Sequence, residues 1–433
     1  MHSEAEISSV NTSIAFGVNI SGYVNSEFGL GEGVRSTLRS LESVNIPFVI
    51  NNCTFNTNHR KLDSTYTNFS DENPYPINLI HINGDMINFF VSSVGIEYFK
   101  NKYNIGFWAW ELPDFPKEWL SAFNLFDEIW TPSNYSVEAI APVSPVPVIK
   151  FMHSLSLPQP QVSKQELGLP DNKFIFLFIF DFYSVFERKN PIAVIKAFQQ
   201  AFGKNDDVLL VLKFSNAKHF PEKSKQLKDF VKNFQNIKLI DNFLLKDEIN
   251  ALIYNCDCYV SLHRSEGFGL TIAEAMFYGK PVIATDYSGN TDFMNITNSF
   301  PLKYSLTTLT EDYAHYKKGN TWAEPDVDHA ASLMQEVFKN KEEAKQIGTK
   351  ASEDIKSWLS PEVIGQKMKN RLEYIRQSSQ KSKENPQFHT ELKHKDAEIE
   401  RLKALVNYME RSKFWQLRNQ WFKLKETLQS KFN

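Results

Sequence analysis

This chain of 433 residues has few cysteines, little net charge and no long apolar run, so it lacks the features of disulfide-rich, nucleic-acid-binding and membrane-spanning proteins. Its three cysteines, Cys53, Cys256 and Cys258, cannot form a paired disulfide framework, and the last two suit the small apolar positions of a buried strand better than a metal site. The formal net charge is only -3, which provides no global attraction for nucleic acid, so any basic site must be local. These absences favour a globular protein of a reducing compartment that binds no nucleic acid.

Long apolar segments are also missing. The longest uninterrupted apolar run, FIFLFIF at 174–180, has the length of a strand, and the start, MHSEAEISSVNTS, lacks the basic and apolar parts of a signal peptide. We therefore expect no transmembrane helix and a cytoplasmic location. The length, with 42% apolar and 23% charged residues, predicts two globular domains and some additional chain.

Most of the chain alternates short apolar runs with amphipathic segments. In the first half, SIAFGVNI, INLIHIN and YNIGFWAW alternate with helical patterns such as GVRSTLRSLESV. In the second half, FIFLFIF, VLLVLKF, CYVSLH and PVIAT alternate with NPIAVIKAFQQAF and TIAEAMFYG. Strands that are apolar on both faces and separated by helices predict mostly parallel sheets with covered faces. We therefore predict two nucleotide-binding-type α/β domains that face each other, over residues 1–155 and 165–360.

The C-terminal part follows another pattern. Residues 361–376 predict one more amphipathic helix, which closes the core, and residues 377–391 are predicted to form a polar linker. The tail, residues 392–433, begins with about two heptads of apolar residues, which favours a short coiled coil. The apolar heptad positions are Leu392, Ile399, Leu402, Val406 and Met409.

The end of the tail is basic and aromatic. Between Arg411 and Lys431 there are six basic residues and one acidic residue, interspersed with phenylalanine and tryptophan. This pattern suits an anionic membrane surface, which would be the inner face of the cell membrane, or a protein partner. The alternative is a helix that packs on the chain's own domain.

The stretch HRSEGFGLTIAEAMFYGK, from His263 to Lys280, carries the clearest chemical signal. A strand precedes it and a helix begins within it, so its glycine-rich loop lies at the carboxyl edge of a parallel sheet, where ligands bind. Gly267 and Gly269 let a ligand approach the backbone, and the free N–H groups of the helix favour an anion. Glu266 lies in the loop and Glu274 lies inside the helix, so they should contact different parts of an extended ligand. A carboxylate accepts two sugar hydroxyl hydrogens at once, which suits either glutamate to bind a sugar. For either glutamate alone, a helix cap or a solvated position is the alternative.

These residues resemble a known family. EGFGLTIAE, GKPVIAT and SGN, with GLGEG, WELPDFP, EIWTPS, ERKNP and WAEPDV, closely resemble the signature of the retaining nucleotide-sugar glycosyltransferases of the GT-B fold, glycosyltransferase family four. The resemblance covers most of residues 14–376. It implies an α/β GT-B fold of two doubly wound Rossmann-like domains across a cleft, with acceptor domain first, donor domain second and a C-terminal helical tail.

The resemblance also implies roles for individual residues. Glu274 would hold the donor ribose, Glu266 would lie beside the donor sugar, and Arg188 with Lys189 would bind the diphosphate. Two cations there would offset charge on the leaving group, so we expect neither a metal nor another cofactor. The loops around the glutamates and the neighbouring glycine loop would supply further donor contacts, namely Gly267, Phe268, Gly269, Leu270, Gly289 and Asn290.

Four other features are candidates by position. Gly31, after the first strand, is predicted to approach the donor phosphates or the acceptor, unless it is an ordinary turn glycine. His81 ends a strand and is a candidate contact of the transferred sugar or acceptor, with a structural histidine as the alternative. Lys213 also ends a strand and should rim the donor cleft. In GFWAWELP, Trp108, Trp110 and Glu111 are candidates for sugar contacts, although aromatic residues beside a strand usually belong to the core.

Pairs of acidic residues can bind divalent ions, and the sequence contains one such pair. Asp326 and Asp328 precede an amphipathic helix, and we expect a helix cap there. The resemblance then implies a hexosyltransferase that uses a nucleotide diphosphate sugar and an acceptor hydroxyl, with retention at the anomeric carbon, and the residues named above lead us to expect that it needs no metal. The basic and aromatic tail alone suggests that the acceptor is a glycan or lipid-linked molecule of cell-surface polysaccharide biosynthesis. The alternatives are a nucleotide-sugar epimerase of the same architecture and a non-catalytic scaffold that binds sugar nucleotides.

Overall fold

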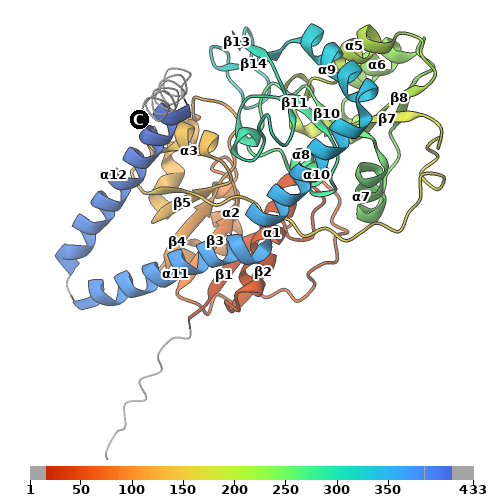
Figure 1. The fold of residues 1–433 in the computed structure, drawn as a ribbon. Helices are drawn as coiled ribbons and strands as arrows, with labels where there is room; N and C mark the ends of the chain where they lie inside the picture. The colour runs from red at the N-terminus through yellow and green to blue at the C-terminus, as the bar shows by residue number, and fades with distance from the viewer. Residues whose placement is uncertain (1–15, 385, 412–433) are drawn as a thin grey trace, which may run out of the picture.

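Two α/β domains make up most of the protein, as the computed structural model in Figure 1 shows for the described residues, 16–384 and 386–411. The N-terminal domain contains a six-stranded parallel sheet in the order β2-β1-β3-β4-β5-β6. Its strands are β1 (Val18–Gly22), β2 (Phe48–Asn52), β3 (Ile77–His81), β4 (Tyr103–Phe107), β5 (Glu128–Thr131) and β6 (Val148–Lys150). Its α-helices are α1 (Gly29–Ser43), α2 (Ile87–Val94) and α3 (Asn134–Ile140), and 3-10 helices span Ile96–Phe99, Lys117–Leu125 and Ala141–Val143.

Both faces of this sheet are covered, which explains the composition of its strands. Every residue of β1 and β3 is buried, so neither strand needs a polar, solvent-facing side. The buried amide of Asn19 is accommodated because it donates hydrogen bonds to Tyr75 O at 2.8 Å and Asn78 Oδ1 at 2.9 Å. The apolar runs noted in the sequence therefore form the predicted doubly wound sheet.

The C-terminal domain repeats this architecture. Its six-stranded sheet has the order β12-β11-β10-β7-β8-β9, with all pairs parallel. The strands are β7 (Phe174–Asp181), β8 (Val208–Ser215), β9 (Ile237–Ile240), β10 (Cys258–Ser261), β11 (Val282–Thr285) and β12 (Phe300–Leu302). The helices are α4 (Phe186–Lys189), α5 (Pro191–Phe202), α6 (Pro221–Val231), α7 (Lys246–Asn255), α8 (Leu270–Phe277), α9 (Val327–Lys339) and α10 (Lys341–Trp358). Cys256 and Cys258 are buried beside and within β10, as the sequence suggested.

A hairpin interrupts this repeat between β12 and α9. Strands β13 (Tyr304–Thr308) and β14 (Thr321–Pro325) pair antiparallel, with Tyr304 opposite Pro325. The sequence analysis did not predict this hairpin. Its connecting loop, residues 309–320, contacts the N-terminal domain and becomes important at the site described below.

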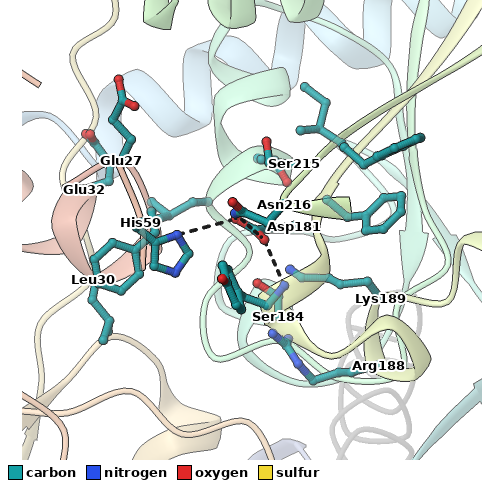
Figure 2. A pocket seen from close by; sticks show the side chains of 18 of the residues that line it. Glu27, Leu30, Glu32, His59, Asp181, Ser184, Arg188, Lys189, Ser215 and Asn216 are labelled. Carbon is teal, nitrogen blue, oxygen red and sulfur yellow. Dashed lines mark hydrogen bonds and ion pairs between the residues drawn. The ribbon is translucent and has the colours of Figure 1, made fainter. Parts of the chain in front are cut away.

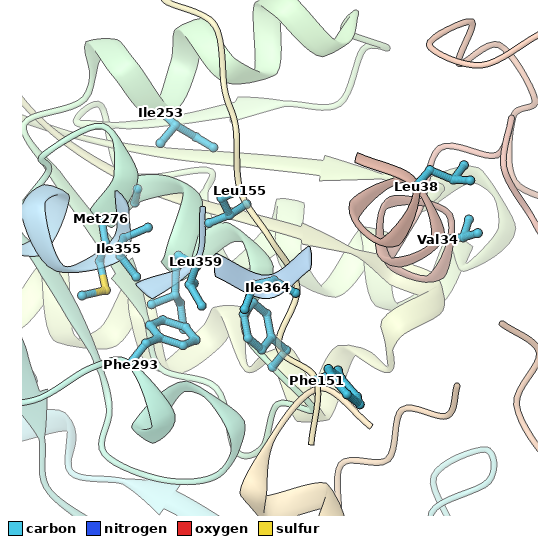
Figure 3. Packing of buried hydrophobic residues seen from close by; sticks show 14 of the residues in the cluster. Val34, Leu38, Phe151, Leu155, Ile253, Met276, Phe293, Ile355, Leu359 and Ile364 are labelled. Carbon is cyan, nitrogen blue, oxygen red and sulfur yellow. The ribbon is translucent and has the colours of Figure 1, made fainter. Parts of the chain in front are cut away.

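One hydrophobic core joins the two domains (Figure 3). It combines Val34 and Leu38 of α1 with Ile355 and Leu359 near the end of α10. The chain between the domains is tied to the same core, because the Leu155 N–H donates to Leu359 O at 2.7 Å. The domains are therefore held by shared apolar packing as well as by the connecting chain.

Helix α11 (Pro361–Glu384) crosses from the second domain onto the first and packs along α1. Its buried residues, Ile364, Met368, Leu372 and Ile375, have helical spacing and face the shared core. Gly365 permits the close approach, since a Cβ there would collide with the Ser40 carbonyl oxygen. This helix closes the core as the sequence predicted for residues 361–376.

The predicted polar linker over 377–391 is not observed. Instead α11 continues to Glu384, and a further helix, α12, spans Pro386–Arg411. Lysine, glutamine and glutamate are good helix formers, and proline at a first helical position does not disturb a helix, so a polar composition did not mean a coil here.

Helix α12 packs against α3 and β6 of the N-terminal domain. Its inner side includes the buried Ala404, whereas Ile399, Leu402 and Val406 are about half exposed. For this part of the tail the structure shows the alternative named above, a helix packed on its own domain. The basic and aromatic end, residues 412–433, lies outside the described residues. Among the helices that the structure describes, none combines the length and apolar character needed to cross a membrane.

Candidate active site

A cavity of about 1310 Å³ lies between the two domains. Its wall is built from loops that follow strands of both sheets, which is where ligands bind in open α/β sheets. Figure 2 shows one part of it, with Glu27 and Glu32 on one side and Arg188 and Lys189 on the other. The predicted site residues that line this cavity are Arg188, Lys189, Lys213, Glu266, Gly267, Phe268, Gly269, Leu270 and Glu274.

Glu266 is held by two cations. The Lys189 Nζ donates to Glu266 Oε1, and Arg188 Nη1 donates to Oε2 at 3.2 Å and to the Ser265 carbonyl oxygen at 2.8 Å. Burial alone would raise the pKa of Glu266, but the charges of Lys189 and Arg188 outweigh it and lower that pKa to about 2. Glu266 is therefore an anion at neutral pH, and without a ligand it provides the negative charge that Arg188 and Lys189 need.

Local backbone geometry fixes the two cations. Arg188 and Lys189 lie on the single-turn helix α4, between Val185 and Asn190, which have positive φ angles of 64° and 55°. Asparagine tolerates this conformation, whereas a β-branched valine rarely adopts it. Strain of this kind is typical of segments shaped for a site rather than for stability.

Glu274 has a different partner. It lies in α8, one turn after the glycine-rich loop, and Lys246 Nζ donates to its Oε1 at 3.0 Å. Burial would lower the pKa of Lys246, but the charges of Glu274 and Glu32 outweigh it and raise that pKa. Glu32 comes from α1 of the other domain, where Arg39 Nη2 donates to Oε1 at 2.7 Å. Glu266 and Glu274 are thus held by separate cations along one cavity wall.

The second glycine loop supports the first instead of lining the cavity. The Gly289 N–H donates to Glu266 O at 2.9 Å, and any Cβ at Gly289 would collide with Gly267. Asn290 is fully buried and donates to Thr285 O at 2.9 Å. Neither residue is among those that line the cavity, so their predicted donor contacts are corrected to a supporting role.

His81 does not reach the cavity. It is only 3% exposed, and its ring stacks on Phe107 of the neighbouring strand with 4.4 Å between centroids. Its Nε2 has no hydrogen-bond partner within the described residues, so His81 is neither a cavity-lining residue nor a structural histidine with satisfied hydrogen bonds.

A different histidine, His153, lines the cavity. Burial lowers the pKa of His153 to about 4, and its Nδ1 has no hydrogen-bond partner within the described part of the chain. It follows the last strand of the first sheet, so its position at a strand end was the signal that the sequence analysis missed.

The predicted ligand contact of Gly31 is not observed, and Lys213 makes backbone contacts in addition to lining the cavity. A Cβ at Gly31 would collide with Ser26 O in its own turn, and it is Gly29 and Leu30 that line the cavity. Lys213 lines the cavity but donates to Phe214 O at 2.7 Å and Asn242 O at 3.1 Å. Burial lowers the pKa of Lys213 to about 8. It therefore braces two adjacent loops besides rimming the cleft.

The aromatic residues of GFWAWELP belong to the core. Trp108 and Trp110 are at most 1% exposed, which excludes them as surfaces for sugar stacking, whereas Glu111 lines the cavity. Asp326 caps α9 as predicted, because its Oδ1 accepts a hydrogen bond from the His329 N–H at 2.9 Å, and Asp328 lies in the first turn of that helix. Within the described residues, no group of three or more histidine, cysteine, aspartate or glutamate side chains could hold a metal ion.

The two facing sheets, the cavity between them and the final helix that returns to the first domain define the GT-B fold, as predicted. Residues 161–298 match the family model described as glycosyl transferases group 1, and these residues include both glutamates and both cations of the site. The resemblance to glycosyltransferases noted in the sequence is thereby confirmed for this segment.

Solved structures agree on the fold. Anabaena HepE, solved with UDP and glucose, has a TM-score of 0.58 and 14% identity, covering 83% of this chain and 100% of its own. A sucrose-phosphate synthase from Thermosynechococcus elongatus has a TM-score of 0.62 and 13% identity, covering 83% and 99%. A glycosyltransferase from Rickettsia africae has a TM-score of 0.58 and 14% identity, covering 83% and 98%.

Proposed function

We propose that this protein is a retaining glycosyltransferase that moves a hexose from a nucleotide diphosphate sugar to a hydroxyl of a glycan or lipid-linked acceptor. The observation that carries the proposal is the arrangement of Glu266 with Arg188 and Lys189 beside the glycine-rich loop, in the segment that matches group 1 glycosyltransferases. HepE was solved with UDP-glucose, so a uridine diphosphate hexose is the first donor to test here.

The geometry suggests how the donor would bind. A diphosphate at Arg188 and Lys189 would take the place of the Glu266 carboxylate as their counter-ion, and the N-terminus of α8 would add its partial positive charge. Glu266 would then be free to accept hydroxyl hydrogens of the hexose, and Glu274 those of the ribose.

The reaction itself exchanges one bond at the anomeric carbon for another. The bond from that carbon to the diphosphate oxygen breaks, and a bond to the acceptor oxygen forms on the same face. The acceptor proton passes to the leaving phosphate, whose charge Arg188 and Lys189 stabilise. Because the chain supplies these charges itself, we propose that the reaction needs no divalent metal.

Two other functions would use the same cavity differently. An epimerase would return an altered nucleotide sugar or a free sugar, and a scaffold would bind the donor without turnover. A thermal-shift screen of UDP-, GDP-, ADP- and dTDP-sugars would select the donor, and transfer of its labelled hexose to glycan acceptors would follow. A new glycoside that forms equally well with and without EDTA supports the proposal. Turnover only after Mn²⁺ or Mg²⁺ is restored would contradict the phosphate site described here.

We also propose that the end of the tail attaches the enzyme to the anionic inner face of the cell membrane, with a protein partner as the other candidate. The basic and aromatic composition of residues 412–433 supports this, together with the position of α12, which ends on the outside of the N-terminal domain (Figure 1). Such attachment would bring the cavity close to acceptors that grow on a lipid carrier.

A further inference from the structure

The β13–β14 hairpin reaches the cavity through the tip of its loop, where His315 and Tyr316 are lining residues. Most of this loop is not buried, and its three buried residues are Leu309, Tyr316 and Asn320. A tight turn forms the tip, because the backbone groups of Tyr313 and Tyr316 pair with each other at 2.8 and 2.9 Å. Tyr316 is only 1% exposed, so this turn places its ring inside the protein.

Tyr316 contacts functional groups of both domains. Its ring lies beneath the guanidinium group of Arg188, with 5.9 Å from the Arg188 Cζ to the ring centroid, which is within the range of a cation–π contact. Its hydroxyl donates to Glu111 Oε2 of the first domain at 3.0 Å. Burial raises the pKa of Tyr316 well above its usual value, so the hydroxyl keeps its proton and remains a donor. Tyr316 therefore connects a diphosphate cation to a carboxylate of the other domain.

Glu111 also acts on that cation. Burial would lower the pKa of Arg188, but neighbouring groups outweigh it and raise that pKa. After Tyr316 itself, the largest of these contributions come from Glu266 and Glu111. Arg188 thus lies near two carboxylates, one from each domain, and the hydroxyl of Tyr316 holds an oxygen of the one from the first domain.

The base of the hairpin is joined to α4 by Arg264. Its Nε and Nη2 donate to the two carboxylate oxygens of Glu324 in β14 at 2.7 and 2.9 Å. Its Nη1 donates to Glu187 O at 2.6 Å, and its backbone N–H donates to Arg188 O at 2.8 Å. These carbonyl groups belong to the single turn of α4, where a helix has no partners of its own for them. The hairpin therefore holds α4 both at its base and at its tip.

Other hydrogen bonds hold the hairpin and the donor loop against the first domain. Asn320 Nδ2 donates to Asp114 O at 3.1 Å, and the Asp114 N–H donates back to Asn320 Oδ1 at 3.4 Å. The Ser265 hydroxyl, beside Glu266, donates to the Glu111 backbone oxygen. These contacts all fall on residues 111–114, directly after the WAW motif. The hairpin and this segment are therefore joined around Glu111.

We propose that Tyr316 is a positioning residue of the proposed reaction: its ring holds Arg188 for the leaving diphosphate, and its hydroxyl joins that position to the first domain through Glu111. The inference rests on the proposed function, because it explains how a cation of that reaction is placed. Tyr316 and Glu111 lie in different domains, so their bond forms only when the domains are together. UDP alone binds through the donor domain, whereas transfer requires this contact.

Nucleotide binding and kinetics separate the ring from the hydroxyl. Tyr316→Phe keeps the ring beneath Arg188, so we expect unchanged UDP affinity in calorimetry. Its kcat for glycoside formation should fall at least about tenfold, the effect of one hydrogen bond to a charged group. Tyr316→Leu also removes the ring, so UDP itself should bind at least about fivefold more weakly. Should Tyr316→Leu fail to fold, Tyr316→Phe, which keeps the size of the side chain, decides alone.

Tyr313→Phe is the matched control. It removes a hydroxyl from the same loop, but this hydroxyl donates to Glu311 Oε1 at 2.9 Å, and Tyr313 does not line the cavity. Its UDP affinity and kcat should equal those of the unmodified protein. A fall in kcat as large as that of Tyr316→Phe would show that any loosening of the loop has this effect and would overturn the specific role of Tyr316.

A double-mutant cycle tests the connection through Glu111. If the hydroxyl acts by holding Glu111, Tyr316→Phe should lower kcat no further in a Glu111→Ala background. Unchanged kcat in Tyr316→Phe, or a fall that Glu111→Ala leaves undiminished, overturns the proposal. Equal UDP affinity of folded Tyr316→Leu and the unmodified protein also overturns it, and this readout needs no turnover. If the UDP affinities follow the predicted pattern but the unmodified protein forms no glycoside, the proposed transferase activity is contradicted and the positioning of Arg188 is supported.

Discussion

At the scale of single residues, the structure separates the two glutamates of the site by their partners. Glu274 pairs with Lys246, and Glu266 with Arg188 and Lys189. Glu274→Ala should weaken both the donor and the bare nucleoside diphosphate by about 1.5–3 kcal/mol, the range for a charged hydrogen-bond partner. That corresponds to roughly 10- to 150-fold in Kd.

Glu266→Ala should behave differently in the same titration. The substitution leaves Arg188 and Lys189 without their carboxylate partner, so the bare nucleoside diphosphate should bind at least as tightly as to the unmodified protein. Turnover should fall sharply, because the hexose no longer has the Glu266 carboxylate to donate hydrogen bonds to. Glu266→Gln serves as the control that keeps the side chain's size. Equal weakening of nucleotide binding by Glu266→Ala and Glu274→Ala would contradict these separate roles.

Two buried histidines predict how stability depends on pH. Burial lowers the pKa of both His153 and His263 from 6.5 to about 4. Between pH 6.5 and 4 these histidines are protonated in the unfolded chain and neutral in the folded chain. Their contribution to the free energy of unfolding is therefore fully present above pH 6.5 and is lost as the pH falls toward 4. Each proton contributes at most about 1.4 kcal/mol per pH unit.

Urea unfolding at pH 7.5, 6.5 and 5.5 measures this dependence. His153→Phe keeps a ring against Phe107 and removes one titrating group, so its urea midpoint should fall less steeply with acid than that of the unmodified protein. Parallel curves for the two proteins would show that His153 is not held neutral by the fold.

How far the sequence predicted these residues depended on where each side chain points. Glu266 and Glu274 were singled out because they lie around the glycines of a strand-to-helix loop, and Lys189 was singled out by the family resemblance; all three line the cavity. His81 and His153 both follow or end strands, and only one of them lines the cavity. A strand alternates its side chains between faces, so a shift of one residue decides between core and site, and the sequence pattern does not fix that shift.

At the scale of elements, the alternation of strands and helices was predictable because both sheets are covered on both faces, which leaves continuous apolar runs. The helical continuation through residues 377–384 was not, since its polar sequence contains no apolar stripe that would indicate a helix. The β13–β14 hairpin was missed for a similar reason. All but one of the residues of β13 are exposed, so its composition carries no clear burial signal.

Truncation of the tail separates the role of α12 from that of the basic segment. A chain that ends at Arg411 keeps α12 on α3 and β6, so it should fold and bind donor normally while losing binding to anionic liposomes. Sedimentation with phosphatidylserine vesicles measures that loss, and neutral vesicles are the control. A chain cut at Gln380 also lacks α12 and uncovers the surface of α3 and β6 on which α12 packs, so we expect lower stability from it. Full liposome binding after the cut at Arg411 would exclude the basic segment as the anchor.

At the scale of the whole molecule, both domains contribute to one site. Besides the shared core, hydrogen bonds connect the domains. The hydroxyl groups of Tyr135 and Tyr287 are hydrogen-bonded to each other at 2.8 Å, and the Asn134 N–H donates to Asp292 Oδ2 at 2.8 Å. His59 reaches from the first domain to within 3.7 Å of Asp181 in the second (Figure 2). The domain arrangement itself therefore brings side chains of both domains to one cavity.

The most direct test of the proposed reaction is the configuration of its product. The full chain is incubated with an α-configured UDP-hexose and a neutral sugar acceptor, and the anomeric proton of the purified product is examined by NMR. We predict an α-glycoside, with the configuration of the donor retained. A β-glycoside, or an epimerised nucleotide sugar without any glycoside, would contradict the account.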